Sequence, residues 1–222
     1  MNIQAVEAVF AIARHLSVEL AETEEAVREA QRLRHQVFCL ERGILPGQPG
    51  QDLEQDEFDP CSRHVLLRHR RSGELVGTAR LVLGASGGLP MLRYCDADIL
   101  RDLPMHTVGE ISRFALSKRC RPMGGAWEPL VRLGLMQGIL RASLELGLTH
   151  WCALMEPTLL RLLRATGVRF VPVGPMVQAY GLRQPAVAPI DLVLADGRRR
   201  RPDFYGFVVG GCAEERRGLP AA

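Results

Sequence analysis

Residues 110–126 read EISRFALSKRCRPMGGA, and this stretch determines how the rest of the chain is interpreted. An apolar, strand-like run leads into a basic turn with two glycines, and a helical pattern follows directly. Glycine lets backbone N–H groups approach an anion without a Cβ in the way, and the helix N-terminus adds a favourable dipole. The pattern predicts a phosphate-binding turn at Arg121, Gly124, Gly125 and Ala126, although an ordinary strand-to-helix turn fits it equally well.

The composition is that of a soluble globular protein. Of the 222 residues, 47% are hydrophobic and 24% are charged, which favours neither a disordered nor a membrane protein. We expect a single α/β domain over residues 1–210 and a flexible C-terminal tail over 211–222. No apolar run reaches membrane-spanning length, and charged residues such as Glu7 and Arg14 interrupt the first twenty positions. The sequence therefore predicts a cytoplasmic protein without a transmembrane segment.

Cysteine spacing and net charge limit the kinds of partner. The six cysteines are scattered without a C-x-x-C pair, which predicts neither a metal site nor a disulfide framework. The net charge of +3 and the 5% aromatic content give little reason to expect nucleic-acid binding. Arginine-rich clusters occur at 68–71, 118–121 and 198–201. They are either solvated charge or contacts for an acidic partner or a phosphorylated ligand.

Hydrophobic periodicity divides the chain into alternating helices and strands. Helices are expected at 20–39, 127–146 and 156–166, with a loop-rich connection at 84–106. Strands are expected at 64–69, 74–83, 108–117, 150–155, 169–173, 177–180 and 189–194. This order predicts a mixed central sheet that is flanked by helices on both faces.

Polar residues interrupt the expected strand 108–117. In a regular strand, Glu110, Ser112 and Phe114 would share one face, whereas Ile111, Arg113 and Ala115 would share the other, and a local bulge would change this. Charges on a central strand are costly unless they are paired or border a cleft. The strand is therefore a candidate for the functional site.

Six charged residues form a balanced set around that strand. They are Asp56, Asp59 and Glu110, with Arg34, Arg80 and Arg113. One interpretation is a buried ion-pair network that fixes the N-terminal helix and the following loop to the sheet. The other, to which we give more weight, is an active-site crevice next to the phosphate-binding turn.

Several ordered blocks of sequence carry a resemblance to known families. Arg34-x-x-x-Phe38, Glu54-x-Asp56-x-Phe58-Asp59, Leu75-Val-Gly-x-x-Arg80 and Glu110-x-Ser112-Arg113-Phe114 resemble the acyl-homoserine-lactone (autoinducer) synthases and the related N-acyl amino acid synthases. Met155-Glu156-Pro157, Gly174-Pro175 and Tyr180-Gly-Leu-Arg-Gln-Pro185 are similar to acyltransferases associated with the PEP-CTERM/exosortase system. The resemblance covers residues 30–190.

The resemblance implies a GNAT-like (acyl-CoA N-acyltransferase) fold without a permanently bound cofactor. It also implies transfer of a fatty acyl group from acyl-carrier protein or coenzyme A to the amine of an amino-acid-like acceptor. Autoinducer synthases carry a tryptophan six residues after the phenylalanine, where this chain has Ile44. That departure weakens the case for homoserine-lactone formation.

Attack on a thioester needs a neutral amine, a proton acceptor and a polarised carbonyl oxygen. We expect Glu110 to be the general base, directly or through water, with Ser112 and Arg113 beside it. The other expected roles are oxyanion binding by backbone N–H groups of Phe114, Ala115 and Leu116, donor-phosphate binding by the 121–126 turn, and acceptor binding by Arg34, Phe38, Asp56, Asp59 and Arg80. Arg80 and Arg113 either bind the acceptor carboxylate or hold Asp56 and Asp59 in place.

The function predicted from sequence is thus N-acyl transfer with a long-chain donor. Three alternatives remain open: an acyl-homoserine-lactone synthase, a small-acyl coenzyme-A-dependent N-acetyltransferase, and a non-catalytic acyl-binding module.

Overall fold

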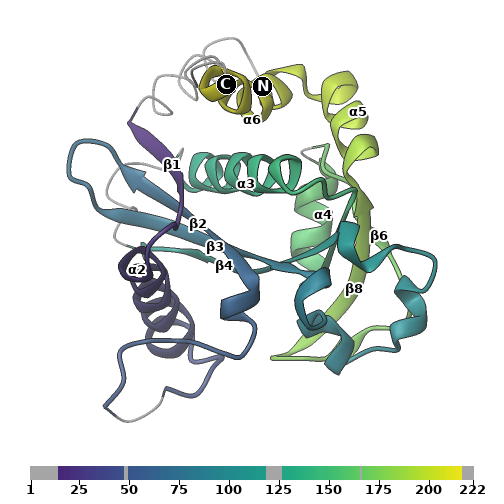
Figure 1. Cartoon of the computed structure of the whole chain (residues 1–222), viewed down its shortest axis with the longest axis horizontal. Coiled ribbons are helices and arrows are strands. Elements are labelled where there is room, and N and C mark those ends of the chain that lie inside the picture. The colour runs from purple at the N-terminus through teal and green to yellow at the C-terminus, as the bar shows by residue number, and fades with distance from the viewer. Residues whose placement is uncertain (1–14, 48–49, 119–126, 166, 217–222) are drawn as a thin grey trace.

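The computed structural model describes residues 15–47, 50–118, 127–165 and 167–216, which form a mixed sheet with helices on both faces (Figure 1). The eight strands have the order β1-β2-β3-β4-β5-β8-β6, with β7 paired to β8. Their bounds are β1 Leu16–Leu20, β2 Ser62–His69, β3 Leu75–Leu83, β4 Val108–Leu116, β5 His150–Met155, β6 Val171–Pro172, β7 Val177–Gln178 and β8 Leu182–Pro189. All neighbours are antiparallel except β4 and β5, so the predicted mixed α/β sheet is confirmed.

Helix α2, Glu24–Arg34, covers one face of the sheet (Figure 1). The Thr23 hydroxyl accepts a hydrogen bond from the Ala26 N–H and so caps the helix start. The chain continues as a π-helix, His35–Glu41, and both Phe38 and Val37 of this segment are buried. The predicted helix at 20–39 is confirmed in outline.

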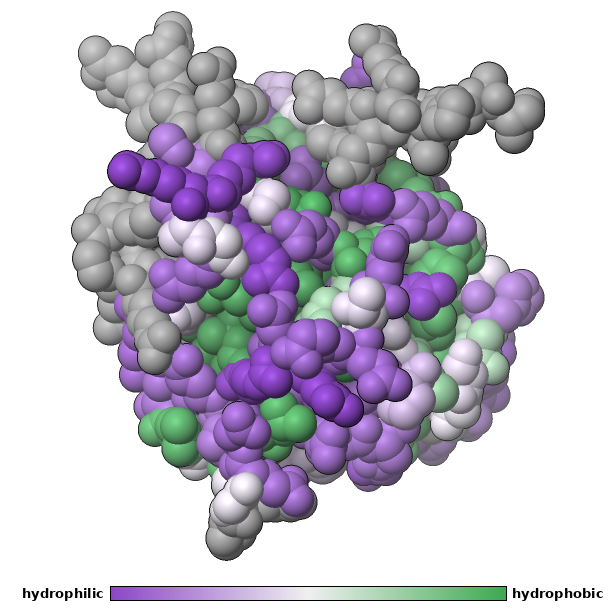
Figure 2. Space-filling view, turned by 60° about the vertical axis from the view of Figure 1, so that its left-hand side comes forward, coloured by the Kyte–Doolittle hydropathy of each residue, from purple (hydrophilic) through white to green (hydrophobic). Residues whose placement is uncertain are grey.

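Helices α3 (Trp127–Glu145) and α6 (Pro202–Arg216) lie on the opposite face, beside α4 (Pro157–Ala165) and α5 (Ile190–Arg200) (Figure 1). Two glycines of α3 allow a close approach to β2. A Cβ at Gly134 would lie 2.7 Å from Leu67, and one at Gly138 would lie 2.3 Å from Val65. The main core forms at this contact. In the face shown in Figure 2, hydrophobic side chains are visible only in small groups among hydrophilic ones.

Strand β4 contains a bulge next to the residues of interest. Thr78 pairs with Ala115 and Arg80 with Ser112, so β4 has one more residue than β3 between these pairs. Arg113 lies in the bulge with a φ of 51°, which is uncommon for a residue other than glycine. The bulge breaks the alternation expected for a regular strand. Ile111 and Phe114, expected on opposite faces, both pack against the core under α3, whereas Ala115, expected to share the face of Ile111, packs with residues of α2 and the π-helix.

Strands β4 and β5 pair over only part of their length. The parallel register joins Val108–Glu110 to His150–Cys152 and goes no further, although β4 continues to Leu116 and β5 to Met155. Beyond these pairs the two strands separate. The gap lies at the carboxyl ends of two parallel strands, which is where open α/β sheets commonly bind ligands.

The second half of the fold differs from the sequence-based expectation in its details. The strand predicted at 189–194 is wrong, because β8 ends at Pro189 and the helix α5 begins at Ile190. Strand β1 was not predicted. The connection at 84–106 contains short 3₁₀ helices at Gly84–Ser86, Pro90–Arg93 and Ala97–Leu100, with a fourth at Met105–Thr107. Helix α6 runs past residue 210, where the flexible tail was expected to begin.

Candidate active site

A closed network of ion pairs joins α2, β3, β4 and the segment of residues 54–59. Each of its three carboxylates contacts two guanidiniums, in the pairs Arg34–Glu54, Arg34–Asp59, Arg80–Asp56, Arg80–Asp59, Arg113–Glu54 and Arg113–Asp56. Arg34 Nη1 lies 2.7 Å from Asp59 Oδ1, and Arg80 Nη1 lies 2.8 Å from the same oxygen. The side chains of Arg34 and Arg80 are fully buried. Every guanidinium of this set is therefore occupied by protein carboxylates.

The arginines determine the protonation of the network. Burial alone would raise the pKa of Asp59, but hydrogen bonds and charges from Arg34 and Arg80 outweigh it and hold that pKa well below its usual range. The pKa of Asp56 is lowered for the same reason, with Arg80 and Arg113 as its partners. Asp56 and Asp59 are therefore ionised at neutral pH.

This arrangement resembles the buried ion-pair network that was one interpretation of the six charged residues, except that Glu54 replaces Glu110. Arg34, Asp56, Asp59 and Arg80 were expected to bind substrate, yet none of them lines either cavity described below. Arg80 holds Asp56 and Asp59, which is the second of the two roles expected for it. Glu54, for which no role was predicted, takes the place expected for Glu110.

Glu110 lies apart from this network in an apolar environment. It is 2% exposed, and its Oε2 accepts a hydrogen bond of 2.8 Å from the Met91 N–H. Burial raises the pKa of Glu110 to about 8, against the smaller lowering effects of the Met91 hydrogen bond and of Arg80. Its carboxyl group is therefore mostly protonated at neutral pH. Glu110 lines neither of the two cavities described below.

A polar cleft of about 540 Å³ lies between the π-helix, β4 and the start of α4. Four of the predicted site residues line it: Phe38, Arg113, Phe114 and Leu116. Arg113 also lies 6.0 Å from the ring centroid of Tyr180, which has a φ of 55°. Arg113 and Tyr180 are the two non-glycine residues of the described chain with a left-handed backbone conformation, and both line this cleft.

The rim of the cleft carries a second group of charges. Glu156 Oε1 lies 3.0 Å from Arg42 Nη2 and 3.2 Å from Arg183 Nη2. Two guanidiniums therefore share one carboxylate, which leaves one positive charge in excess, unlike the balanced network beneath. These three residues and Tyr180 were not predicted as site residues, although Glu156, Tyr180 and Arg183 belong to the quoted blocks.

An apolar cavity of about 510 Å³ adjoins the cleft under α3, α4, α5 and α6. Arg113 and Phe114 line both spaces, so the two meet at the β4 bulge. The other apolar lining residues include Met136, Leu140, Leu163, Phe170, Val193 and Val208. A cavity of this size and composition suits a hydrocarbon chain.

Backbone groups of β4 face the gap between the separated strands. The Ser117 N–H donates to the Val76 carbonyl on β3. Because N–H directions alternate along a strand, the Leu116 N–H points to the opposite side, toward β5. Ser112 Oγ accepts a hydrogen bond of 3.1 Å from Arg80 Nε and also lines the apolar cavity. The predicted phosphate turn, Arg121 with Gly124, Gly125 and Ala126, lies outside the described residues.

The comparisons with known proteins agree with this architecture. A family model described as "Acetyltransferase (GNAT) domain" matches residues 33–126, and a search of curated proteins gives no significant match. The match begins at the end of α2 and includes the whole ion-pair network and the β4 bulge. The fold is therefore that of a GNAT domain, and the match supports an acyltransferase.

Solved structures with the same fold include two that are described as acyl synthases. TofI, in a ternary complex with an inhibitor and MTA, has a TM-score of 0.64 and 22% identity, covering 82% of this chain and 95% of that one. BjaI, a CoA-dependent acyl-homoserine lactone synthase with SAM and isopentyl-CoA, has a TM-score of 0.59 and 22% identity. The match covers 89% of this chain and 85% of BjaI. FeeM, an N-acyl amino acid synthase from uncultured soil microbes, has a TM-score of 0.53 and 15% identity. The match covers 82% of this chain and 94% of FeeM. At these identities the similarity establishes the fold alone.

Two further observations concern ligands and membranes. Within the described ranges, no group of three or more histidine, cysteine or acidic side chains is placed to hold a metal ion. No helix of the described part of the chain is long and apolar enough to cross a bilayer.

Proposed function

We propose that this protein is an N-acyltransferase that moves a long-chain fatty acyl group from acyl-carrier protein or a coenzyme A thioester to the amine of an amino-acid-like acceptor. The observation that carries the proposal is the apolar cavity of about 510 Å³, which meets the polar cleft at the β4 bulge. A thioester carbonyl at the bulge would have its acyl chain in the cavity and its attacking amine in the cleft. An acetyl group alone would leave most of that cavity empty.

The open stretch of β4 suits the donor. A phosphopantetheine arm is an extended chain with two amides, and it can add to the unpaired edge of β4 in the manner of an extra strand. The Leu116 N–H, directed into the gap by strand alternation, is available to this arm or to the developing oxyanion. The backbone N–H groups of Phe114 and Ala115 are proposed for the same role. The turn that contains Arg121 is proposed to bind the donor phosphate.

The acceptor is proposed to bind at the rim of the cleft. The arginines of the inner network are saturated, so an acceptor carboxylate needs another cation. Arg183 and Arg42 share the single carboxylate of Glu156, and guanidinium forks bind carboxylates bidentately. We assign the acceptor carboxylate to Arg183, whose side chain is 15% exposed.

Removal of the acceptor proton remains assigned to Glu110. Its raised pKa matches a group that takes up a proton near pH 8. Because the side chain is sealed from both cavities, the proton must reach it along a path through water or neighbouring groups. Ser112 and Arg113 follow Glu110 along β4 and line the apolar cavity.

Formation of a homoserine lactone is the second candidate. BjaI and LasI, the latter an AHL synthase, have this fold at TM-scores of 0.59 and 0.58. Ile44 lines the cleft at the position where autoinducer synthases carry tryptophan. Association with the PEP-CTERM/exosortase system and a cytoplasmic location rest on the sequence alone.

Product identification with defined donors tests the proposal. Purified protein is incubated with C2 to C16 acyl thioesters of acyl-carrier protein and of coenzyme A, an amino acid mixture and S-adenosylmethionine, and the products are identified by mass. We expect long-chain N-acyl amino acids. The Met136→Trp variant should shift the preferred chain length downward because it fills the cavity, whereas Leu40→Trp at an exposed position should not. Exclusive use of acetyl donors, or equal behaviour of both variants, would overturn the long-chain assignment.

A further inference from the structure

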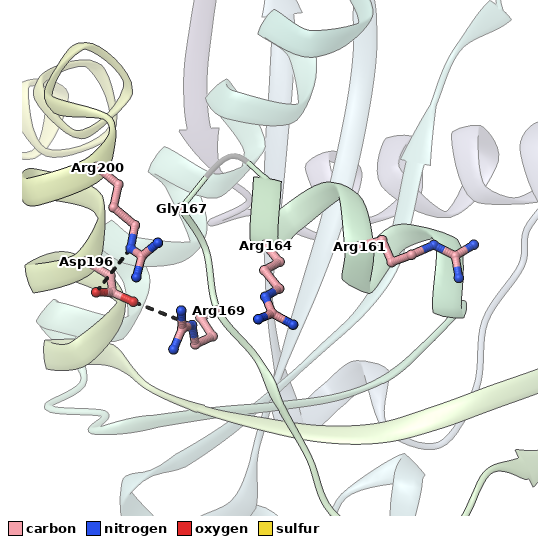
Figure 3. Close-up of a pocket in the computed structure, with 6 residues that line it drawn as sticks. All are labelled: Arg161, Arg164, Gly167, Arg169, Asp196 and Arg200. Carbon is pink, nitrogen blue, oxygen red and sulfur yellow. Dashed lines mark ion pairs between the residues drawn. The ribbon is translucent and has the colours of Figure 1, made fainter.

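A hollow of about 320 Å³ lies between α4 and the last turns of α5, apart from the cleft and the apolar cavity. Figure 3 shows the six residues that line it: Arg161, Arg164, Gly167, Arg169, Asp196 and Arg200. None of them lines either of the other two spaces. The hollow is therefore separate from the candidate active site.

Helical spacing explains why the charges gather here. On α4, Arg161 and Arg164 are three residues apart and share a side of the helix, whereas Leu159 and Leu163 line the apolar cavity. On α5, Asp196 and Arg200 face the hollow, whereas Val193 and Gly197 face the cavity. Each helix thus separates the two spaces.

The loop between α4 and β6 supplies the remaining arginine. Gly167 has a φ of 89° and lies against Gly197 of α5, where a Cβ at Gly167 would be 3.7 Å from the Gly197 Cα. This backbone conformation suits glycine and turns the loop toward α5. Arg169 consequently faces Asp196, with 3.6 Å between Nε and Oδ2.

The charges in the hollow do not balance. The single carboxylate, Asp196, is already shared by Arg169, by Arg200 at 3.7 Å and by Arg199 at 3.0 Å. Arg161 and Arg164 form no ion pair with any residue in the described part of the chain. Four lining guanidiniums and one carboxylate leave a formal charge of +3, which an anionic ligand would neutralise.

The arrangement of the arginines indicates the kind of anion. The guanidiniums of Arg164, Arg169 and Arg200 lie around the space between the two helices, whereas Arg161 points away from them along α4 (Figure 3). They come from α4, the following loop and α5, so one small anion cannot contact them all. Guanidinium groups match phosphate oxygens in geometry as well as charge. We propose that this hollow binds a small soluble ligand that carries at least two phosphate groups.

Calorimetric titration of the full chain with inorganic pyrophosphate at low salt tests this site. We expect one saturable site that binds pyrophosphate more tightly than orthophosphate, and that weakens at 0.5 M salt because screening reduces the attraction. The double variant Arg161→Gln/Arg164→Gln should weaken binding about tenfold or more. Neither residue has an ion pair to lose within the described chain, so the variant should fold normally.

The matched control is Arg70→Gln/Arg71→Gln. It removes the same two charges from the exposed turn between β2 and β3 and should bind pyrophosphate like the original protein. Arg164→Glu provides a second variant that reverses a single charge and should weaken binding further than Arg164→Gln. The absence of a saturable site, equal weakening by both double variants, or binding only to phosphatidylglycerol vesicles would overturn the proposal. The titration measures no turnover, so its outcome does not depend on the proposed acyl transfer.

Discussion

The inner ion-pair network and the arginine hollow both gather guanidiniums, but only the first neutralises them. Beneath α2, three arginines meet three carboxylates, and the side chains of Arg34 and Arg80 are fully buried. Between α4 and α5, four arginines and the one carboxylate of Asp196 line a hollow near solvent, and only Arg169 and Arg200 of these arginines pair with Asp196. Buried charges are tolerated only when they are paired, whereas solvent-exposed charges can remain unpaired and bind a ligand. The balance of positive and negative charge, more than the number of arginines, therefore distinguishes a structural ion-pair network from a binding site.

The largest expected effect comes from breaking the balance of the network. Asp59→Asn should lower the free energy of unfolding by about 3–5 kcal/mol, because it leaves Arg34 and Arg80 with an uncompensated buried charge. Chemical denaturation measures this loss. The control Asp98→Asn, which removes an exposed partner of Arg101, should change stability by less than about 0.5 kcal/mol. Similar losses for both variants would mean that burial does not distinguish the network.

The sequence predicted much of this fold because its signals were local. The strands at 64–69, 74–83 and 108–117 and the long helix at 127–146 follow from hydrophobic periodicity within one segment. Strand β1 and the switch from strand to helix at Ile190 depend on partners elsewhere: β1 is stabilised by its pairing with β2, and Ile190 is buried against the core. No local pattern contains those partners.

The site was predicted in its composition but only partly in its geometry. The sequence identified five of the six network residues, since the acidic segment and the arginines recur in ordered blocks. It could not tell that Glu54 would enter the network while Glu110 turned to the Met91 N–H. The bulge at Arg113 changes the faces of the residues that follow Ser112, and Arg113 in this bulge contacts both Glu54 and Asp56. The rim residues Arg42 and Glu156 are 114 positions apart and meet only through the fold.

The second comparison concerns Glu110, which lies beside the network without being ionised by it. If Glu110 accepts the acceptor proton, Glu110→Gln should reduce kcat by about 100-fold or more, since an amide cannot take up the proton. The kcat of the wild-type protein should rise with pH up to about 8, the pKa of this group. Unchanged turnover in Glu110→Gln would instead show that the side chain only fills the core, since glutamine resembles the protonated acid.

The pH dependence of stability provides the control for that variant. The pKa of Glu110 is about 8 in the folded protein and near 4.5 in the unfolded chain, so the folded state binds more protons between these values. Stability from this group is complete below pH 4.5 and is lost as the pH rises through 8. Burial lowers the pKa of His64 to about 4, which acts in the opposite direction below pH 6.5. Between pH 6.5 and 8 the wild-type protein should therefore lose about 2 kcal/mol, and Glu110→Gln should lose little of it.

The smallest expected effect distinguishes the unbalanced rim of the cleft from the balanced network below it. Arg183→Gln should raise the KM for the acceptor about tenfold and leave kcat and thermal stability nearly unchanged, because Glu156 keeps Arg42 as its partner. Replacing the acceptor carboxylate by a carboxamide should weaken binding to the wild-type protein but cause little further loss in the variant. Arg70→Gln, at an exposed turn, serves as the control. A fall in kcat together with melting temperature would instead assign Arg183 to the same bracing role as Arg34 and Arg80.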